Sequence, residues 1–224
     1  VDGFLYGVHC NAGAVAMNLA VAKHYAKLPI EKRKHGLIFL FVGDHENPGV
    51  GATDKWLESN EALADKLLVN LRPEKIGIMQ EIDEGWIATA RSNVASPSML
   101  MVTNKSPLLL DLFKQATNLY SLSISDFLFS DPAADETNFH PPYVDKDIIS
   151  AGYTISSRYY HTTADYENNL VSAEELEKFA RAHVYITDKL GDYSKADLEK
   201  GATPYTAEKS IYQSDTLKLM FGNH

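Results

Sequence analysis

Four short polar clusters in this sequence combine side chains that bind metals or transfer protons. They are His9-Cys10-Asn11, Asp44-His45-Glu46, Glu81-Ile82-Asp83-Glu84 and His161-Thr162-Thr163-Ala164-Asp165. Carboxylate, imidazole and thiol groups are the usual ligands of zinc, and a carboxylate beside an imidazole also suits proton transfer. The simpler alternative for each cluster is a solvated turn, a capping residue or a core histidine. For Asp165 that alternative is the cap of a turn.

Each cluster lies next to an expected strand. Six apolar residues, Leu37–Val42, run directly into the cluster around His45 and then into the small-residue loop Gly49–Ala52. An all-apolar strand of this kind is typical of a sheet buried on both faces. The segment Lys75–Ile82 alternates as a strand and ends in the second acidic cluster, and Ala151–Tyr160 is the strand expected before His161.

The carboxyl ends of parallel strands meet at one edge of a sheet. We therefore expect Cys10, Glu46, His161 and either Glu81 or Asp83 to lie in one neighbourhood. Glu81 and Asp83 share one face of an alternating strand, so the sequence leaves open which of them faces the site.

Helices are expected between these strands. Their apolar residues recur with helical spacing, and the last helix opens with a capping box, Ser172 and Glu175. The expected helices span Asn11–Leu28, Thr53–Leu71, Ser106–Leu122 and Ser172–Leu190. The alternation of strands and helices predicts an α/β fold, a three-layer sandwich with a mainly parallel sheet and helices on both faces. We expect residues 1–224 to form a single domain, with Phe127–Ile149 as a loop over the site.

Composition narrows the classes of function. The net charge of -9 argues against a surface for nucleic acid or an anionic membrane. No apolar run approaches the roughly 20 residues that a membrane helix requires, and the single cysteine excludes an internal disulfide. The sequence opens on Val1 and Asp2, without a Met and as if inside a strand, so we expect a truncated or processed fragment that lacks amino-terminal strands.

The ordered set of motifs resembles the co-catalytic di-zinc aminopeptidases, which include bacterial secreted aminopeptidases and glutamate carboxypeptidase. Residues Gly7–Ala16 align without a gap on the family's Gly-Ala-x-Asp-Asn-Ala-Ser-Gly-Val-Ala segment, and His45–Ala52 keeps the family's spacing from its second acid to its closing small pair. Ser130-Asp131 resembles the family's Ser-Asp step, and His161–Asp165 resembles its terminal His-Thr-x-x-Asp motif. Val1-Asp2 resembles the tail of its His-x-Asp motif. The resemblance spans residues 1–192.

This resemblance implies a zinc-exopeptidase-like fold and aminopeptidase-type hydrolysis of a peptide or small amino-acyl substrate, with one or two zinc ions. It favours an extracellular or periplasmic location. The implied metal ligands are Cys10, Glu46, His161 and either Glu81 or Asp83. Three further residues, Asp2, Asn11 and Asp131, would orient these ligands.

The sequence departs from the family at two central positions. The bridging Asp of the family falls on Cys10, and its proton-shuttling Glu falls on His45, while its first His would precede Val1. A thiolate is a zinc ligand and an imidazole is a competent base near neutral pH, so we expect His45 to act as the catalytic base. The alternatives are a catalytically degenerate relative that binds or assembles, and a single-zinc activity like that of glutaminyl cyclase. A missing amino-terminal segment or a second copy of the chain is the expected macromolecular partner.

Overall fold

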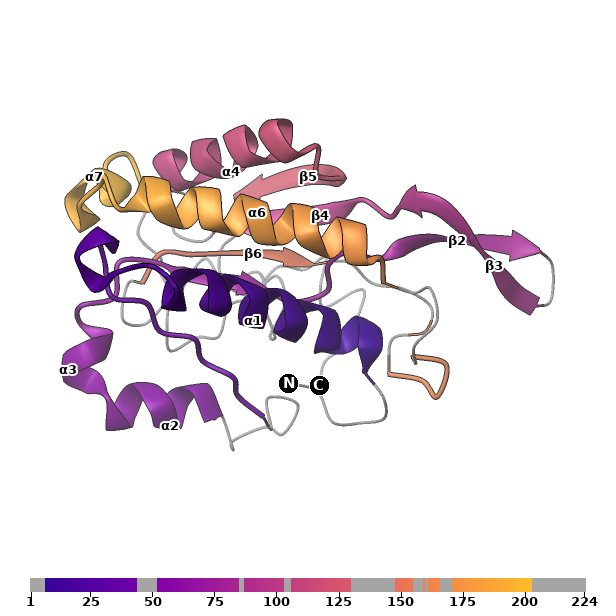
Figure 1. Cartoon of the computed structure of the whole chain (residues 1–224), viewed down its shortest axis with the longest axis horizontal. Helices are drawn as coiled ribbons and strands as arrows, with labels where there is room; N and C mark the ends of the chain where they lie inside the picture. Colours follow the sequence, from indigo (N-terminus) through magenta and orange to yellow (C-terminus); the bar gives the residue numbers. More distant parts are fainter. Residues whose placement is uncertain are drawn as a thin grey trace, which may run out of the picture.

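The structure is a computed structural model that describes residues 7–43, 52–84, 87–102, 106–129, 148–154, 159, 161–165 and 171–202. A four-stranded sheet lies against a layer of long helices (Figure 1). The strands follow the order β1-β6-β4-β5, with bounds β1 Asn70–Pro73, β6 Ser150–Thr154, β4 Ser98–Val102 and β5 Ile124–Phe129.

The sheet is mixed. β1 pairs with β6 in parallel and β4 pairs with β5 in parallel, whereas β4 and β6 run antiparallel. The β4–β5 pair is a strand–helix–strand unit closed by α4 (Pro107–Tyr120), the connection that parallel neighbours require. The expected α/β class is therefore confirmed, with one antiparallel pairing in the described sheet.

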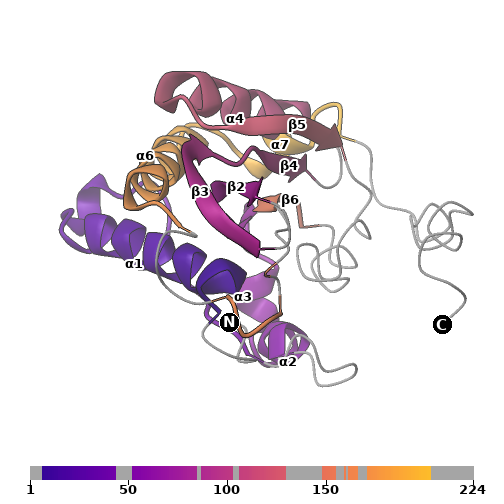
Figure 2. The same cartoon turned by 90° about the vertical axis from the view of Figure 1, so that its right-hand side faces the viewer.

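Three long helices cover one face of the sheet (Figure 2). They are α1 (Gly13–Ala26), α4 and α6 (Ala173–Leu190), with α6 packed between the other two. The Ser106 hydroxyl caps α4 by accepting from Leu109 N at 3.4 Å, and the Ser172 hydroxyl caps α6 by accepting from Glu175 N at 3.3 Å. The Glu175 carboxylate itself accepts from Lys178 Nζ at 2.6 Å. The three helices that the apolar spacing of the sequence predicts are therefore confirmed.

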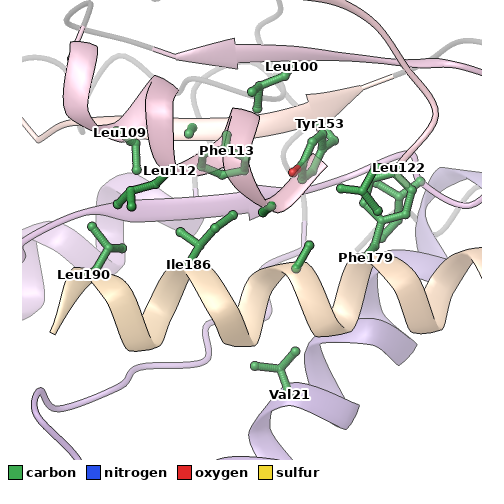
Figure 3. Packing of buried hydrophobic residues seen from close by; sticks show 14 of the residues in the cluster. Val21, Leu100, Leu109, Leu112, Phe113, Leu122, Tyr153, Phe179, Ile186 and Leu190 are labelled. Atoms are coloured by element: carbon green, nitrogen blue, oxygen red, sulfur yellow. The ribbon is translucent and has the colours of Figure 1, made fainter. Parts of the chain in front are cut away.

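Apolar side chains, aliphatic and aromatic, fill the space between this helical layer and the sheet (Figure 3). The ring centroid of Tyr153, on β6, lies 5.3 Å from that of Phe113 on α4 and 4.9 Å from that of Phe179 on α6. All three side chains are buried, so one apolar cluster joins both helices to the sheet.

The expected helix over Thr53–Leu71 is wrong beyond its first half. The chain forms α2 (Ala52–Ser59) and the single turn α3 (Glu61–Ala64), and then enters β1. Asn60 interrupts the helix with φ of -128°, while its Nδ2 donates to Trp56 O at 2.8 Å. Short 3-10 and π turns, η2 (Ile30–Lys32) and η1 (Val8–Ala12), flank α1, and α7 (Lys195–Glu199) follows α6.

Two strand predictions are corrected. The strand expected at Lys75–Ile82 is displaced: β2 (Met79–Glu84) pairs with β3 (Ile87–Ala95) in an antiparallel hairpin that extends away from the main sheet (Figure 1). The expected buried strand Leu37–Val42 has neither strand nor helix structure in the described chain, and several of its side chains are exposed. A strand needs a neighbour to pair with, which a local apolar run cannot guarantee. The strand expected at Ala151–Tyr160 is described as β6 over Ser150–Thr154, and Tyr159 lies in a turn.

Candidate functional site

The segment at the start of α1 and the His161–Asp165 loop are joined by one carboxylate. Asp165 Oδ1 accepts from His9 N at 2.6 Å, and its Oδ2 accepts from Cys10 N at 3.2 Å. The Asp165 carbonyl also accepts from Val8 N at 3.5 Å. Asp165 is 2% exposed, and Cys10 precedes it by 155 positions in the sequence. We call this arrangement the Asp165 clamp. Asp165 therefore joins two distant segments rather than only capping a local turn.

The loop that carries His161 is a tight turn shaped by Thr162. His161 has a left-handed φ of 57° and an exposed side chain. The Thr162 hydroxyl donates to Tyr159 O at 2.8 Å and accepts from Ala164 N at 3.2 Å, while Asp165 N donates to Thr162 O at 3.1 Å. Such side-chain-to-backbone bonds fix a turn without a helix or sheet. The turn thereby presents His161 outward and Asp165 inward.

Facing this loop, the turn η1 carries buried polar groups. His9 and Cys10 are both buried. The Asn11 Oδ1 atom is also buried, and it accepts no hydrogen bond from the residues that the structure describes. An unsatisfied buried acceptor costs about 1–3 kcal/mol, so such an atom calls for a donor or a cation. The Asn11 amide oxygen is therefore a buried acceptor that has no donor among the described residues.

A buried ion pair that sequence reasoning missed follows β1. Glu74 is 0% exposed and Lys75 is 3% exposed, and Lys75 Nζ lies 3.5 Å from Glu74 Oε1. Burying two charges is costly, and charged groups outside the carboxyl ends of parallel strands are typical of α/β binding sites. In the sequence, Pro73-Glu74-Lys75 follows a largely apolar stretch, which could have indicated this pair. The strand expected at Lys75–Ile82 assigned Lys75 to a strand instead, so the pair was not predicted.

The segment after this ion pair packs against the start of α1. A Cβ built on Gly13 would lie 3.7 Å from Ile76 O and 3.3 Å from Val171 Cγ1. Ile78 forms a bridge with Val171, and Ser172 N donates to Gly77 O at 2.8 Å. The chain after Glu74 and the helix that follows Cys10 are therefore direct neighbours.

The structure brings some of the predicted site residues together and places others elsewhere. Cys10, Asn11 and the His161 loop lie together at the Asp165 clamp. Glu81 and Asp83 belong to the β2–β3 hairpin, whose end is not at the edge of the main sheet. Four residues lie outside the described residues: Asp2, His45, Glu46 and Asp131. The metal-binding and catalytic roles of all these residues stay predictions.

The donor atoms near the clamp fit zinc by chemical type. Cys10 offers a thiol sulfur and His161 an imidazole, both common zinc ligands, and the unsatisfied Asn11 Oδ1 lies beside Cys10 in sequence. Within the described ranges, no group of three or more His, Cys, Asp or Glu side chains is arranged to hold a metal ion. A complete ligand set therefore needs Glu46 or another residue outside those ranges.

Beside the site, a cavity of about 900 Å³ extends along α1, β1 and Leu37–Val42. His183 of α6 lines it, and burial lowers the pKa of this imidazole to about 4 while its Nδ1 contacts Phe179 O at 2.9 Å. Tyr25 lines it as well and donates to Asp188 Oδ1 at 2.7 Å. Burial, and then the Asp188 carboxylate, raise the Tyr25 pKa well above its usual value. Both side chains therefore stay neutral near pH 7.

No known protein family, curated protein or solved structure matches this chain. Among the described helices, none is both long enough and apolar enough to cross a membrane.

Proposed function

We propose that this chain is a metal-dependent exopeptidase of the aminopeptidase type, built on a three-layer, zinc-exopeptidase-like α/β fold. The observation that carries the proposal is the Asp165 clamp. Two motifs that resemble zinc-peptidase motifs, one at each end of the chain, meet through the Asp165 carboxylate and the His9 and Cys10 amides. A purely local turn cap would not require this contact.

In this proposal Cys10, Glu46 and His161 hold one or two zinc ions, together with a further carboxylate. Glu81 and Asp83 are the candidates from the sequence, although both belong to the β2–β3 hairpin. Glu74 joins these carboxylate candidates because it is fully buried directly after β1. Bound zinc would polarise the scissile carbonyl and lower the pKa of a bound water.

The chain's own residues supply the remaining chemistry. His45 accepts the proton of the attacking water through its neutral imidazole and returns it to the leaving amine. Asp165 fixes the backbone of Cys10, and Asp2, Asn11 and Asp131 orient the metal ligands. The substrate is a peptide or a small amino-acyl compound.

The test combines metal analysis with hydrolysis of a panel of aminoacyl-p-nitroanilides. We expect one or two zinc equivalents per chain and a rate that rises with pH through about 6 to 7, because a neutral imidazole is required. Glu46→Gln should lower the rate at least tenfold, whereas Asp111→Asn, an exposed substitution on α4, should leave it unchanged. The proposal is contradicted if the purified protein contains no zinc and hydrolyses none of the substrates after zinc is added.

A second candidate, a degenerate relative that binds without cutting, is favoured by the burial of Cys10. This thiol, 2% exposed, stands where the family places a bridging carboxylate. The double variant Cys10→Asp with His45→Glu separates the two functions. Activity gained or increased by it supports a detuned peptidase, and an inactive double variant that is correctly folded supports a binding protein.

A further inference from the structure

The apolar segment Leu37–Val42 lies outside the sheet although its composition suits a buried strand. Leu37, Ile38 and Phe41 are 37%, 44% and 42% exposed. The backbone of residues 37–41 forms no hydrogen bond within the described part of the chain, whereas Phe39 already packs against the main core. Exposed apolar side chains and unpaired amides are both unfavourable, so this arrangement leaves stabilisation unrealised.

A vacant position for a strand lies beside this segment. β1 is an end strand of the described sheet, and its outer edge pairs with no described strand. The cavity of about 900 Å³ borders this edge, with Val21 and Tyr25 of α1 on one wall and Trp56 and Leu67 of the α2–α3 region on another. An unpaired sheet edge normally has to be covered or paired.

The structure assigns the occupant of this position: we propose that Leu37–Val42 docks on the outer edge of β1 as an additional strand and closes the cavity. The segment already lines the cavity, and the described residues on either side of it, 33–36 and 43, form neither helix nor strand. Because it is tethered to the same chain, it reaches the edge at a high effective concentration, ahead of a separate partner.

The connection fixes the direction of the added strand. The order of segments is Leu37–Val42, then α2 and α3, then β1, which is a strand–helix–strand unit. Neighbouring strands joined in this way are parallel, with a right-handed crossover. The carboxyl end of the added strand then lies at the same edge as Pro73, next to the buried Glu74 and Lys75.

Because His45 and Glu46 follow Val42 in the sequence, docking would place the start of their segment at the sheet edge that carries Glu74. This consequence rests on the proposed function, whereas the docking itself does not. The test below uses neither substrate nor metal, so its failure and the failure of the peptidase proposal are distinguishable.

Hydrogen–deuterium exchange of the full chain tests the pairing directly. An added parallel strand donates alternate amides to β1, so peptides covering residues 37–42 should contain amides that exchange at least ~100-fold more slowly than in an unstructured chain. Exchange of every amide in these peptides at the open-chain rate overturns the proposal. Strong binding of an apolar dye together with that fast exchange would show that the cavity stays open for a small ligand.

A matched pair of lysine substitutions provides the second measurement. Ile38→Lys and Ile30→Lys both replace an exposed Ile, at 44% and 78% exposure. Ile38 lines the cavity that docking would close, so Ile38→Lys should lower Tm by at least ~5 °C while Ile30→Lys changes it by less than ~1 °C. Equal, small shifts for both variants overturn the proposal. If Ile38→Lys fails to fold, the milder Ile38→Thr is compared with Ile30→Thr in the same way.

Discussion

At the scale of single residues, Asp165 is the side chain whose role is most specific to the candidate site. Both of its carboxylate oxygens accept backbone N–H groups from the turn that carries Cys10. We predict that Asp165→Ala frees this turn and exposes the buried thiol. The rate of Cys10 modification by a thiol reagent under native conditions should rise at least ~10-fold, because local opening exposes a group that the native state protects.

The control for this prediction is Asp111→Asn, which changes an exposed carboxylate on α4 and should leave the thiol rate at its wild-type value. Circular dichroism establishes that both variants are folded. An Asp165→Ala protein that is folded and has an unchanged thiol rate would show that other contacts hold the turn.

His183 makes a second residue-scale prediction, which concerns pH. Burial lowers the pKa of this imidazole to about 4 from an ordinary value of 6.5. Between these two values the unfolded chain binds a proton that the folded chain does not, so the free energy of unfolding falls as the pH falls. The contribution is fully present above about pH 6.5 and is lost by about pH 4, a change of about 3 kcal/mol.

Chemical denaturation at several pH values measures this effect. The variant His183→Leu replaces the imidazole with an apolar side chain of similar size and so removes the titrating group. Between pH 7 and pH 4 the free energy of unfolding of wild type should fall by about 2–3 kcal/mol more than that of the variant. Parallel pH profiles for the two proteins would mean that His183 is protonated in the folded state as easily as in the unfolded chain.

At the scale of elements, the β1–β6 pair depends on the absence of a side chain at one position. Gly152 of β6 pairs with Arg72 of β1, and a Cβ on Gly152 would lie 2.4 Å from the Arg72 carbonyl oxygen. A backbone atom cannot move away without breaking the pairing. We predict that Gly152→Ala lowers the free energy of unfolding by at least about 2 kcal/mol.

Gly36→Ala is the matched control, since a Cβ at Gly36 meets no atom within 4 Å. Its effect should stay within about 0.5 kcal/mol of wild type, measured by denaturation in urea. Similar stabilities for the two variants would contradict the close packing of β1 on β6.

At the scale of the whole molecule, α6 connects the helical layer. It packs against both α1 and α4, and its Phe179 reaches Tyr153 in the sheet (Figure 3). We predict that Phe179→Ala costs about 3–5 kcal/mol, from lost burial and the cavity left behind. Because one apolar cluster that includes Tyr25 and Tyr153 spans these elements, far-ultraviolet circular dichroism and tyrosine absorbance should report the same, lower unfolding midpoint.

The comparison for this prediction is Leu119→Ala on α4, where the side chain is 59% exposed. That change should shift the midpoint little, within about 0.5 kcal/mol. Separate midpoints for the two probes in wild type would contradict the single domain expected from the sequence.

Three of the four expected helices were determined by the sequence itself, whereas the helix expected at Thr53–Leu71 was not. The apolar spacing and the capping box at Ser172 predict α1, α4 and α6 to within a few residues of their observed bounds. These signals succeed because helical hydrogen bonds and caps join residues within one or two turns. The residue types of the candidate site, such as Cys10 and His161, were equally visible in the sequence.

Strand pairing and the assembly of the site were decided only by the tertiary structure. The hydrogen-bond partners of β1, β4 and β6 are distant in sequence, so a local pattern does not reveal whether Leu37–Val42 is paired or that residues 79–84 turn into a hairpin. The same holds for Asp165, whose partners His9 and Cys10 lie at the other end of the chain, and for the burial of Glu74 and Lys75. Burial and long-range hydrogen bonds depend on which segments meet in space, and no short stretch of sequence contains that information.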